Sequence, residues 1–114
     1  MARDAAVSRQ TRETKIEIQL NLDGSGQADI TSGIAFFDHM LTAFCVHGRF
    51  DLKLMARGDL EVDLHHTVED VGLVLGQTLS DALGDKTGIQ RFGDGCVPMD
   101  EALSRVTIDL CNRP

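Results

Sequence analysis

Alternating apolar and polar positions predict most of the strands of this chain. Residues 15–22 alternate in this way, as expected of a strand with one solvated face, and the apolar positions are Ile16, Ile18, Leu20 and Leu22. The Asp-Gly-Ser-Gly run at residues 23–26 predicts a turn, after which residues 27–31 are expected to return as the second strand of a hairpin. Residues 50–56 alternate again, and a turn at residues 57–59 followed by alternation over residues 60–64 predicts a second hairpin.

Two segments carry apolar residues at helical spacing instead. The first helix is expected to end at Gly48, and its apolar stripe is Phe37, Met40, Leu41, Phe44 and Cys45. The second is expected to close near Gly84, and its stripe is Val68, Val71, Leu75, Leu79, Ala82 and Leu83. Each stripe predicts a helix that packs one face on the core.

The remaining segments complete a predicted α+β fold. Residues 88–98 are rich in glycine and are expected to be mostly loop, while residues 103–110 alternate as a last strand. The order hairpin, helix, hairpin, helix, strand predicts a mixed sheet with two helices on one face. The last strand has no predicted partner, so we expect that the chain is a fragment or that another subunit covers this edge.

Composition and charge narrow the functional classes. The 114 residues suit one core, and the net charge of −7 without a basic run argues against a nucleic-acid partner. No apolar run approaches the roughly 20 residues that span a bilayer, and the polar first 15 residues lack the apolar stretch of a signal peptide. The three cysteines include no CxxC pair, and Cys45 fits a buried position. We therefore expect a reduced, cytoplasmic protein without membrane contact.

The HHTVED motif at residues 65–70 is the most informative segment for chemistry. If the second helix begins at or before His65, then His65 and Glu69 project from one face and can share a divalent ion. His66 is rotated by about 100° around the helix axis and cannot easily join the same ion. The motif therefore suggests two ions, and imidazole with carboxylate suits manganese, iron, zinc or nickel.

Structural roles compete with metal binding for these residues. Thr67 and Asp70 match a capping box, in which Thr67 would be the N-cap and both histidines would precede the helix. Taken alone, His39 near the start of the first helix can be merely solvated. Arg91 and Arg113 can be ordinary surface charges, and Glu13 lies in a polar segment without a signal of its own.

Several motifs together resemble the imidazoleglycerol-phosphate dehydratase family from about residue 11 to residue 114. They are FFDHML at residues 36–41, HGRFDL at 47–52, GDLEVDLHHTVEDVG at 58–72, QRFG at 90–93 and VPMDEAL at 97–103. The resemblance implies dehydration of imidazole glycerol phosphate to imidazole acetol phosphate in histidine biosynthesis. It also implies a fold like the second domain of ribosomal protein S5, and homo-oligomeric shells of 24 subunits.

The resemblance also implies roles for individual residues. Two Mn²⁺ ions per active centre would be held by His39 with His66 and by His65 with Glu69, and these four ligands also face the substrate. The family's other substrate contacts fall on Glu13, His47, Arg91 and Arg113. Glu13 is the expected catalytic acid or base, and the two arginines are expected to bind the small-molecule phosphate substrate.

The family's chain is close to twice as long as this one, which implies two similar halves. Residues 1–88 are expected to form the first repeat, and residues 89–114 the connection and opening strand of a truncated second repeat. Residues 112–114 resemble the family's GRP segment, with Asn112 in place of glycine. Because the second repeat supplies further ligands, this fragment is expected to be inactive alone. The alternative function is a non-catalytic metal-binding assembly module.

Overall fold

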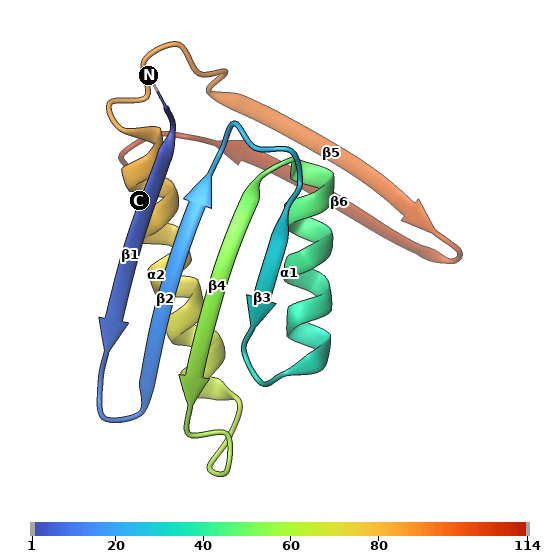
Figure 1. Cartoon of the computed structure of the whole chain (residues 1–114). Coiled ribbons are helices and arrows are strands. Elements are labelled where there is room, and N and C mark those ends of the chain that lie inside the picture. Colours follow the sequence, from blue (N-terminus) through green and yellow to red (C-terminus); the bar gives the residue numbers. More distant parts are fainter. Residues whose placement is uncertain (1, 114) are drawn as a thin grey trace. The chain divides into compact units, whose positions relative to one another are not determined.

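The computed structural model describes residues 2–113, which belong to two compact units that divide after Gly84. Pro114, the last residue of the predicted second segment, lies outside the described residues. The first unit contains β1 (Asp4–Gln10), β2 (Thr14–Asn21), β3 (Ala28–Thr31), α1 (Ala35–Gly48), β4 (Asp51–Gly58) and α2 (His65–Leu83). The second contains β5 (Phe92–Met99) and β6 (Ala102–Asp109). Figure 1 shows these elements along the chain.

The sheet of the first unit has the strand order β1-β2-β4-β3. β2 pairs antiparallel with β1 and with β4, whereas β3 pairs parallel with β4. The register between β2 and β4 sets Ile18 opposite Leu54 and Leu20 opposite Leu52, so the apolar positions of both strands share one face. The sheet is therefore mixed, as predicted.

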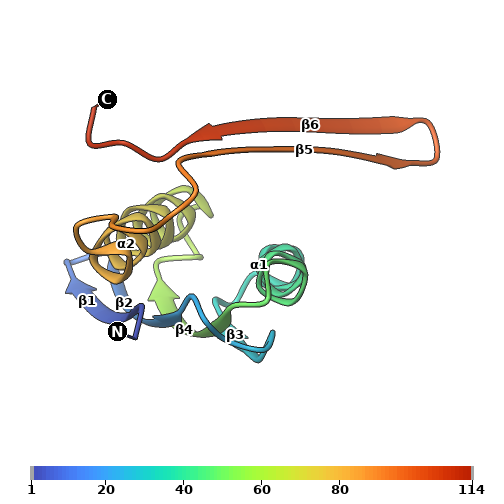
Figure 2. The ribbon, with the colours of Figure 1, turned by 90° about the horizontal axis from the view of Figure 1, so that it is seen from above.

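Both helices cover the same face of this sheet (Figure 2). α2 packs on β1, β2 and β4, while α1 packs on β3 and β4. The residues buried between the two layers are Ile16, Ile18, Leu20, Cys45, Leu52, Leu54, Ala56, Val71 and Val74. The predicted α+β class, with two helices on one face of a mixed sheet, is confirmed.

The predicted hairpin between residues 15–22 and 27–31 is wrong. β3 lies at the edge of the sheet, and β4 separates it from β2. The chain leaves β3 through α1 and returns as β4, and a strand that is joined to its neighbour by a helix runs parallel to it. The chain does turn after β2, at residues 22–23, and residues 24–27 are irregular, but the pairing partner of β3 comes later in the sequence.

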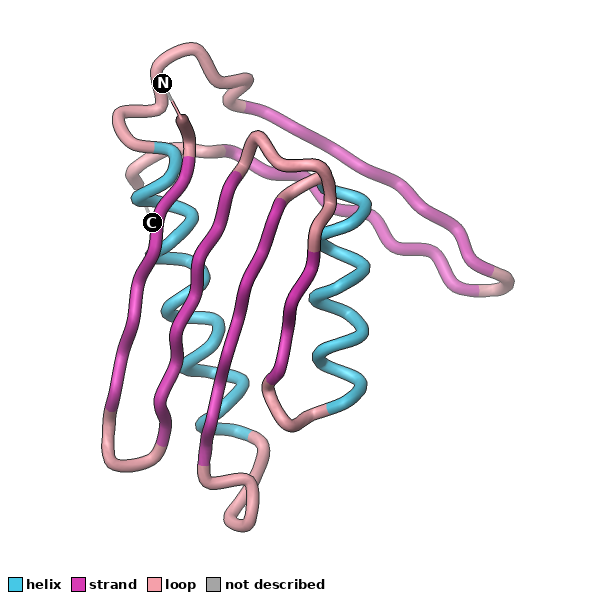
Figure 3. The backbone as a smooth tube through the Cα atoms, viewed as in Figure 1, coloured by secondary structure: helices cyan, strands magenta, loops and turns pink. Residues whose placement is uncertain are grey.

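Three further segments differ from the prediction. β1 was not predicted, because only Ala5 and Val7 of this edge strand are partly buried, which leaves little apolar alternation. Residues 59–64 form a loop between β4 and α2 instead of a returning strand (Figure 3). Val62 is exposed in this loop. Residues 92–99 form a strand despite Gly93 and Gly95, because their backbone pairs with β6. The strand propensities of the individual residues do not predict this pairing.

The second unit is an antiparallel hairpin, so the last strand does have a partner, contrary to expectation. Val97 and Met99 share one hairpin face with Val106 and Ile108, and all four side chains are at least half exposed. Whether this hairpin opens a second repeat stays a prediction. Among the described residues, no helix is long and apolar enough to cross a membrane.

Candidate metal and substrate site

The HHTVED motif forms the first turn and a half of α2, which begins at His65. Asp63 accepts the backbone N–H of His65 at 3.2 Å, and it accepts that of Leu64 as well. Thr67 is therefore not the N-cap, and its side chain is fully buried inside the first turn. The capping-box interpretation is wrong, because the preceding loop already supplies a carboxylate to the helix start.

His65 and Glu69 face each other across one helical turn. His65 Nε2 lies 2.7 Å from Glu69 Oε2, and both side chains are more than half exposed. Two ligand atoms bound about 2.1 Å from one ion at a right angle to each other lie about 3.0 Å apart. The pair thus has the donor types and nearly the separation that one divalent cation needs.

His66 turns away from this pair, as the helix geometry predicts. The two imidazole rings lie 5.5 Å apart between centroids and are inclined by 68°. His66 Nδ1 is 2.8 Å from Asp59 Oδ2 and 3.6 Å from Glu13 Oε2. The two histidines therefore have separate carboxylate partners and cannot act as one bidentate group.

The surroundings of His66 favour its protonated form. The hydrogen bond to Asp59 raises the pKa of His66, and partial burial opposes this effect. The negative charges of Asp59, Glu13 and Asp70 add to the increase in this pKa.

Glu13 reaches this place from the loop between β1 and β2. Its backbone N–H donates to Thr11 Oγ1 at 3.1 Å, which fixes the turn. The next residue, Thr14, is buried, and its hydroxyl donates to the buried carboxylate of Asp70 on α2. This bond ties the loop to the start of α2, so the structure brings the side chains of Glu13 and His66 close together.

The two histidines of α1 lie apart from this cluster within the chain. His39 is exposed just after the first turn of α1, with its ring 6.3 Å from that of Phe36. His47 is exposed in the last turn, about 12 Å further along the helix axis. A metal shared by His39 and His66, with one of them from a neighbouring subunit, stays a prediction.

Both predicted phosphate-binding arginines belong to the second unit. Arg91 forms a bidentate pair with Asp109, at 2.6 and 3.1 Å, and its guanidinium lies 4.9 Å from the Phe92 ring centre. Arg91 holds the pKa of Asp109 below its ordinary value. Arg113 is exposed. A phosphate at Arg91 would therefore compete with an internal carboxylate.

The donor set is incomplete for tight metal binding. Within residues 2–113, no three His, Cys, Asp or Glu side chains are arranged to hold one ion. The residues present fit two half-sites, one at His65 with Glu69 and one at His66, and a catalytic metal normally has about three protein ligands.

Sequence reasoning missed two residues of this cluster, Asp59 and Thr14. The sequence predicts a hairpin turn at Asp59, because the alternation of residues 60–64 favours a strand leading away from it. The loop instead folds back, and Val62 N–H donates to the carbonyl of Asp59 at 2.8 Å. Three acids and a glycine just before HHTVED could have suggested a ligand-supporting loop, had the alternation of residues 60–64 not pointed to a strand.

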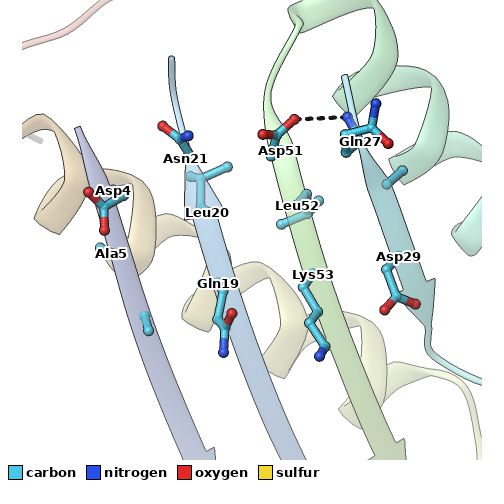
Figure 4. Close-up of a pocket in the computed structure, with 12 residues that line it drawn as sticks. Asp4, Ala5, Gln19, Leu20, Asn21, Gln27, Asp29, Asp51, Leu52 and Lys53 are labelled. Atoms are coloured by element: carbon cyan, nitrogen blue, oxygen red, sulfur yellow. Dashed lines mark hydrogen bonds between the residues drawn. The ribbon is translucent and has the colours of Figure 1, made fainter. Parts of the chain in front are cut away.

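A separate hollow lies over one end of the sheet and is lined by residues of all four strands (Figure 4). Its lining contains no histidine or arginine and none of the predicted site residues. Asp51 Oδ1 accepts the backbone N–H groups of Ser25 and Gln27, each at 2.9 Å. These bonds, Ser25 first, hold the pKa of Asp51 below its ordinary value. The hollow therefore has a structural carboxylate that orders the loop before β3.

We expect this loop to loosen in acid. A carboxyl group whose pKa is depressed by folding contributes stability above its unfolded pKa of about 3.9, and this contribution is lost as pH falls through the lower folded pKa. Hydrogen exchange at the amides of Ser25 and Gln27 should accelerate over that range, and in Asp51→Ala it should be fast at neutral pH. Asp29→Ala, in the same hollow, is the control. Unchanged protection in Asp51→Ala would contradict this role.

Comparison with known proteins agrees with the motifs at this site. A sequence profile described as imidazoleglycerol-phosphate dehydratase matches residues 32–114. Proteins of that name from Thermoanaerobacter pseudethanolicus and Acidithiobacillus ferrooxidans are 61% and 57% identical over 112 residues, which is 98% of this chain. This chain spans 58% and 56% of their lengths.

Solved structures of the same name share the fold. The one from Staphylococcus aureus matches with a TM-score of 0.82 and 35% identity, over 97% of this chain and 59% of that one. The one from Pyrococcus furiosus matches with a TM-score of 0.79 and 36% identity, over 95% of this chain and 56% of that one. Given the profile match, the identities and the shared fold, this chain belongs to the imidazoleglycerol-phosphate dehydratase family.

Proposed function

We propose that this chain is part of a hydro-lyase that dehydrates imidazole glycerol phosphate in histidine biosynthesis. The observation that carries the proposal is that the two adjacent histidines at the start of α2 face different carboxylates. His65 faces Glu69 at 2.7 Å, while His66 faces Asp59 at 2.8 Å with Glu13 beside it. Two imidazoles with separate acidic surroundings suit a site that binds two cations on either side of one substrate.

Glu13 is the residue that we assign to proton transfer. Dehydration takes a proton from one carbon of the substrate and hydroxide from the next, which leave together as water. A carboxylate on a short, fixed loop can accept the carbon-bound proton or protonate the departing hydroxyl. Glu13 Oε2 lies 3.6 Å from His66 Nδ1, so the candidate acid–base group and a candidate ligand belong to the same site. A metal-binding assembly module would not require this arrangement.

We propose two Mn²⁺ ions as cofactors, held in part by His65 with Glu69 and by His66 with His39. Bound cations would polarise the substrate's imidazole ring and hydroxyl, which makes the proton easier to remove. By holding the two ions in place, His65, His66 and Glu69 would orient the imidazole ring of the substrate. His47 would contact the substrate from another part of the assembly. Arg91 and Arg113 would bind the phosphate, since a guanidinium matches two of its oxygens.

Assembly into a homo-oligomer is part of the proposal, with the 24-subunit shell as the expected form. Met40 and Phe44, which were expected to pack on the core, lie instead with Phe36 on the outer side of α1, where Phe36 is 73%, Met40 50% and Phe44 45% exposed. A helix that is apolar on its outer as well as its inner side is usually buried in the assembled protein. Free Cys45, Cys96 and Cys111 suit a reducing compartment, and we propose the cytoplasm.

Replacing Glu69 by Gln in the full-length gene product should lower manganese affinity and turnover together, each by at least about tenfold. The neutral amide keeps the size of the side chain but removes the charge that stabilises a cation. Metal content by elemental analysis and turnover with imidazole glycerol phosphate measure the two effects.

The control for this substitution is Asp81→Asn, which removes a charge from the same helix about 18 Å away along its axis. It should leave both quantities unchanged. If Glu69→Gln retains full metal content and full turnover, Glu69 has no part in metal binding and the two-ion assignment fails.

The proposed function itself is tested with the full-length gene product, manganese and imidazole glycerol phosphate. Formation of imidazole acetol phosphate, and its loss in Glu13→Gln with manganese still bound, would support the proposal. Manganese binding without any dehydration would instead favour the assembly module.

A further inference from the structure

We propose that Asp59 is a positioning residue that fixes the imidazole of His66 as the Nδ1–H tautomer and so presents Nε2 as its metal-binding atom. The inference rests on the proposed function, and it deepens that function by assigning a role to a residue outside the predicted ligand set. Asp59 lies in the loop between β4 and α2 and does not itself need to touch metal or substrate.

The geometry fixes which ring nitrogen carries the proton. Asp59 Oδ2 is 2.8 Å from His66 Nδ1, within normal hydrogen-bond distance. An ionised carboxylate can only accept hydrogen bonds, so Nδ1 must be the donor. Glu13 Oε2, 3.6 Å from the same nitrogen, adds a second negative charge on that side of the ring. In a neutral imidazole with Nδ1 protonated, Nε2 carries the lone pair that a metal requires.

The surroundings of Asp59 indicate that this bond is its main function. Its side chain is only 16% exposed, and Oδ1 is buried without a hydrogen-bond partner among residues 2–113. A buried carboxylate with one unpartnered oxygen is costly for folding, so a purely structural role explains it poorly. His66 Nε2, by contrast, has no hydrogen-bond partner among the same residues and is free to bind a ligand. Carboxylate–histidine–metal arrangements of this kind orient the ring and raise the basicity of the ligand.

The tautomer can be read directly from nitrogen-15 NMR of histidine-labelled, metal-free protein. At about pH 8.5, well above the range in which imidazoles usually titrate, the two ring nitrogens give distinct shifts for the protonated and unprotonated states. The His66 signals are identified by their disappearance in His66→Gln. We expect His66 as the Nδ1–H form. An Nε2–H form, or an equal mixture of both, would overturn the inference without any variant having to fold.

Asp59→Asn tests whether the tautomer matters for metal binding. The amide can donate to Nδ1 and thereby favour the Nε2–H form, as an equivalent Asp→Asn change does in a serine-protease triad. In the full-length gene product, we expect the His66 nitrogen shifts to exchange and the affinity for manganese chloride to fall about 10- to 100-fold. Glu61→Gln, which neutralises an exposed acid in the same loop, should change neither.

The outcomes separate this inference from the proposed function. Unchanged manganese affinity in Asp59→Asn, with the tautomer exchanged, shows that Asp59 does not act on the metal and overturns the positioning role. Absence of manganese binding in the unsubstituted full-length gene product overturns the proposed function, and with it the metal-presenting part of this inference. Exchange of the tautomer together with the loss of affinity supports both.

Discussion

A polypeptide of these 114 residues alone should dehydrate imidazole glycerol phosphate at least about a thousandfold more slowly than the full-length gene product, a difference of about 4 kcal/mol in the activation barrier. Within residues 2–113, no three His, Cys, Asp or Glu side chains can hold one ion. The pair of His65 with Glu69 offers one ion two ligands, and water would fill the remaining positions. Such an ion is weakly bound and poorly oriented, so the chemistry that depends on it should be lost.

The measurement is turnover and bound manganese per chain, on protein whose intact mass matches the 114 residues, beside the full-length product at equal concentration. Circular dichroism on both confirms that the comparison is between folded proteins. Two tightly bound manganese ions per chain with full turnover would show that residues outside this chain are dispensable. The two half-sites within this chain would then suffice for metal binding and catalysis.

Gly58→Ala should destabilise the first unit by about 3 kcal/mol, a large loss for a single added methyl group. Gly58 ends β4, and a Cβ atom there would lie 1.8 Å from Thr67 Oγ1 and 3.0 Å from Thr67 Cβ. Thr67 is fully buried in the first turn of α2, so its side chain has no room to move away. The start of α2, with His65 and His66 on it, would have to shift from the sheet.

Thr67→Ala provides the internal test of this explanation. The Thr67 hydroxyl is buried without a hydrogen-bond partner among the described residues, so its removal alone should cost only about 1 kcal/mol. In the double variant with Gly58→Ala the severe contact is gone, although the two Cβ atoms remain tight. By urea unfolding, we expect the double variant to lose about 1–2 kcal/mol less stability than the sum of the losses in the two single variants.

Gly72→Ala is the matched control for the added methyl group. Its Cβ would meet nothing within 4 Å, and alanine is the better helix former, so this variant should be more stable by about 0.5–1 kcal/mol. Additive effects of Gly58→Ala and Thr67→Ala would show that the destabilisation does not arise from this contact.

The sequence by itself determined the elements whose periodicity is strong. β2 and β4 were predicted because their inward positions, such as Ile18 and Leu54, alternate with outward positions that are polar except for Met55. The helices were predicted because an apolar stripe at a spacing of three and four residues needs a core to cover it. The HHTVED motif placed His65 and Glu69 on one side of α2 and His66 on another, since the rotation per residue of a helix is fixed.

Only the tertiary structure decided which strands pair and which side chains meet. β3 pairs with β4 instead of β2 because α1 carries the chain over the sheet, and local alternation carries no information on such a partner. β1 and β5 are strands because their backbone groups bond to β2 and β6, although their own side chains predict little. Asp59 and Glu13 lie seven and 53 positions before His66, and neither spacing belongs to a regular element. Their contact with His66 arises from two loops that meet at the start of α2, and it depends on the burial of Thr14 and Asp70 beneath them.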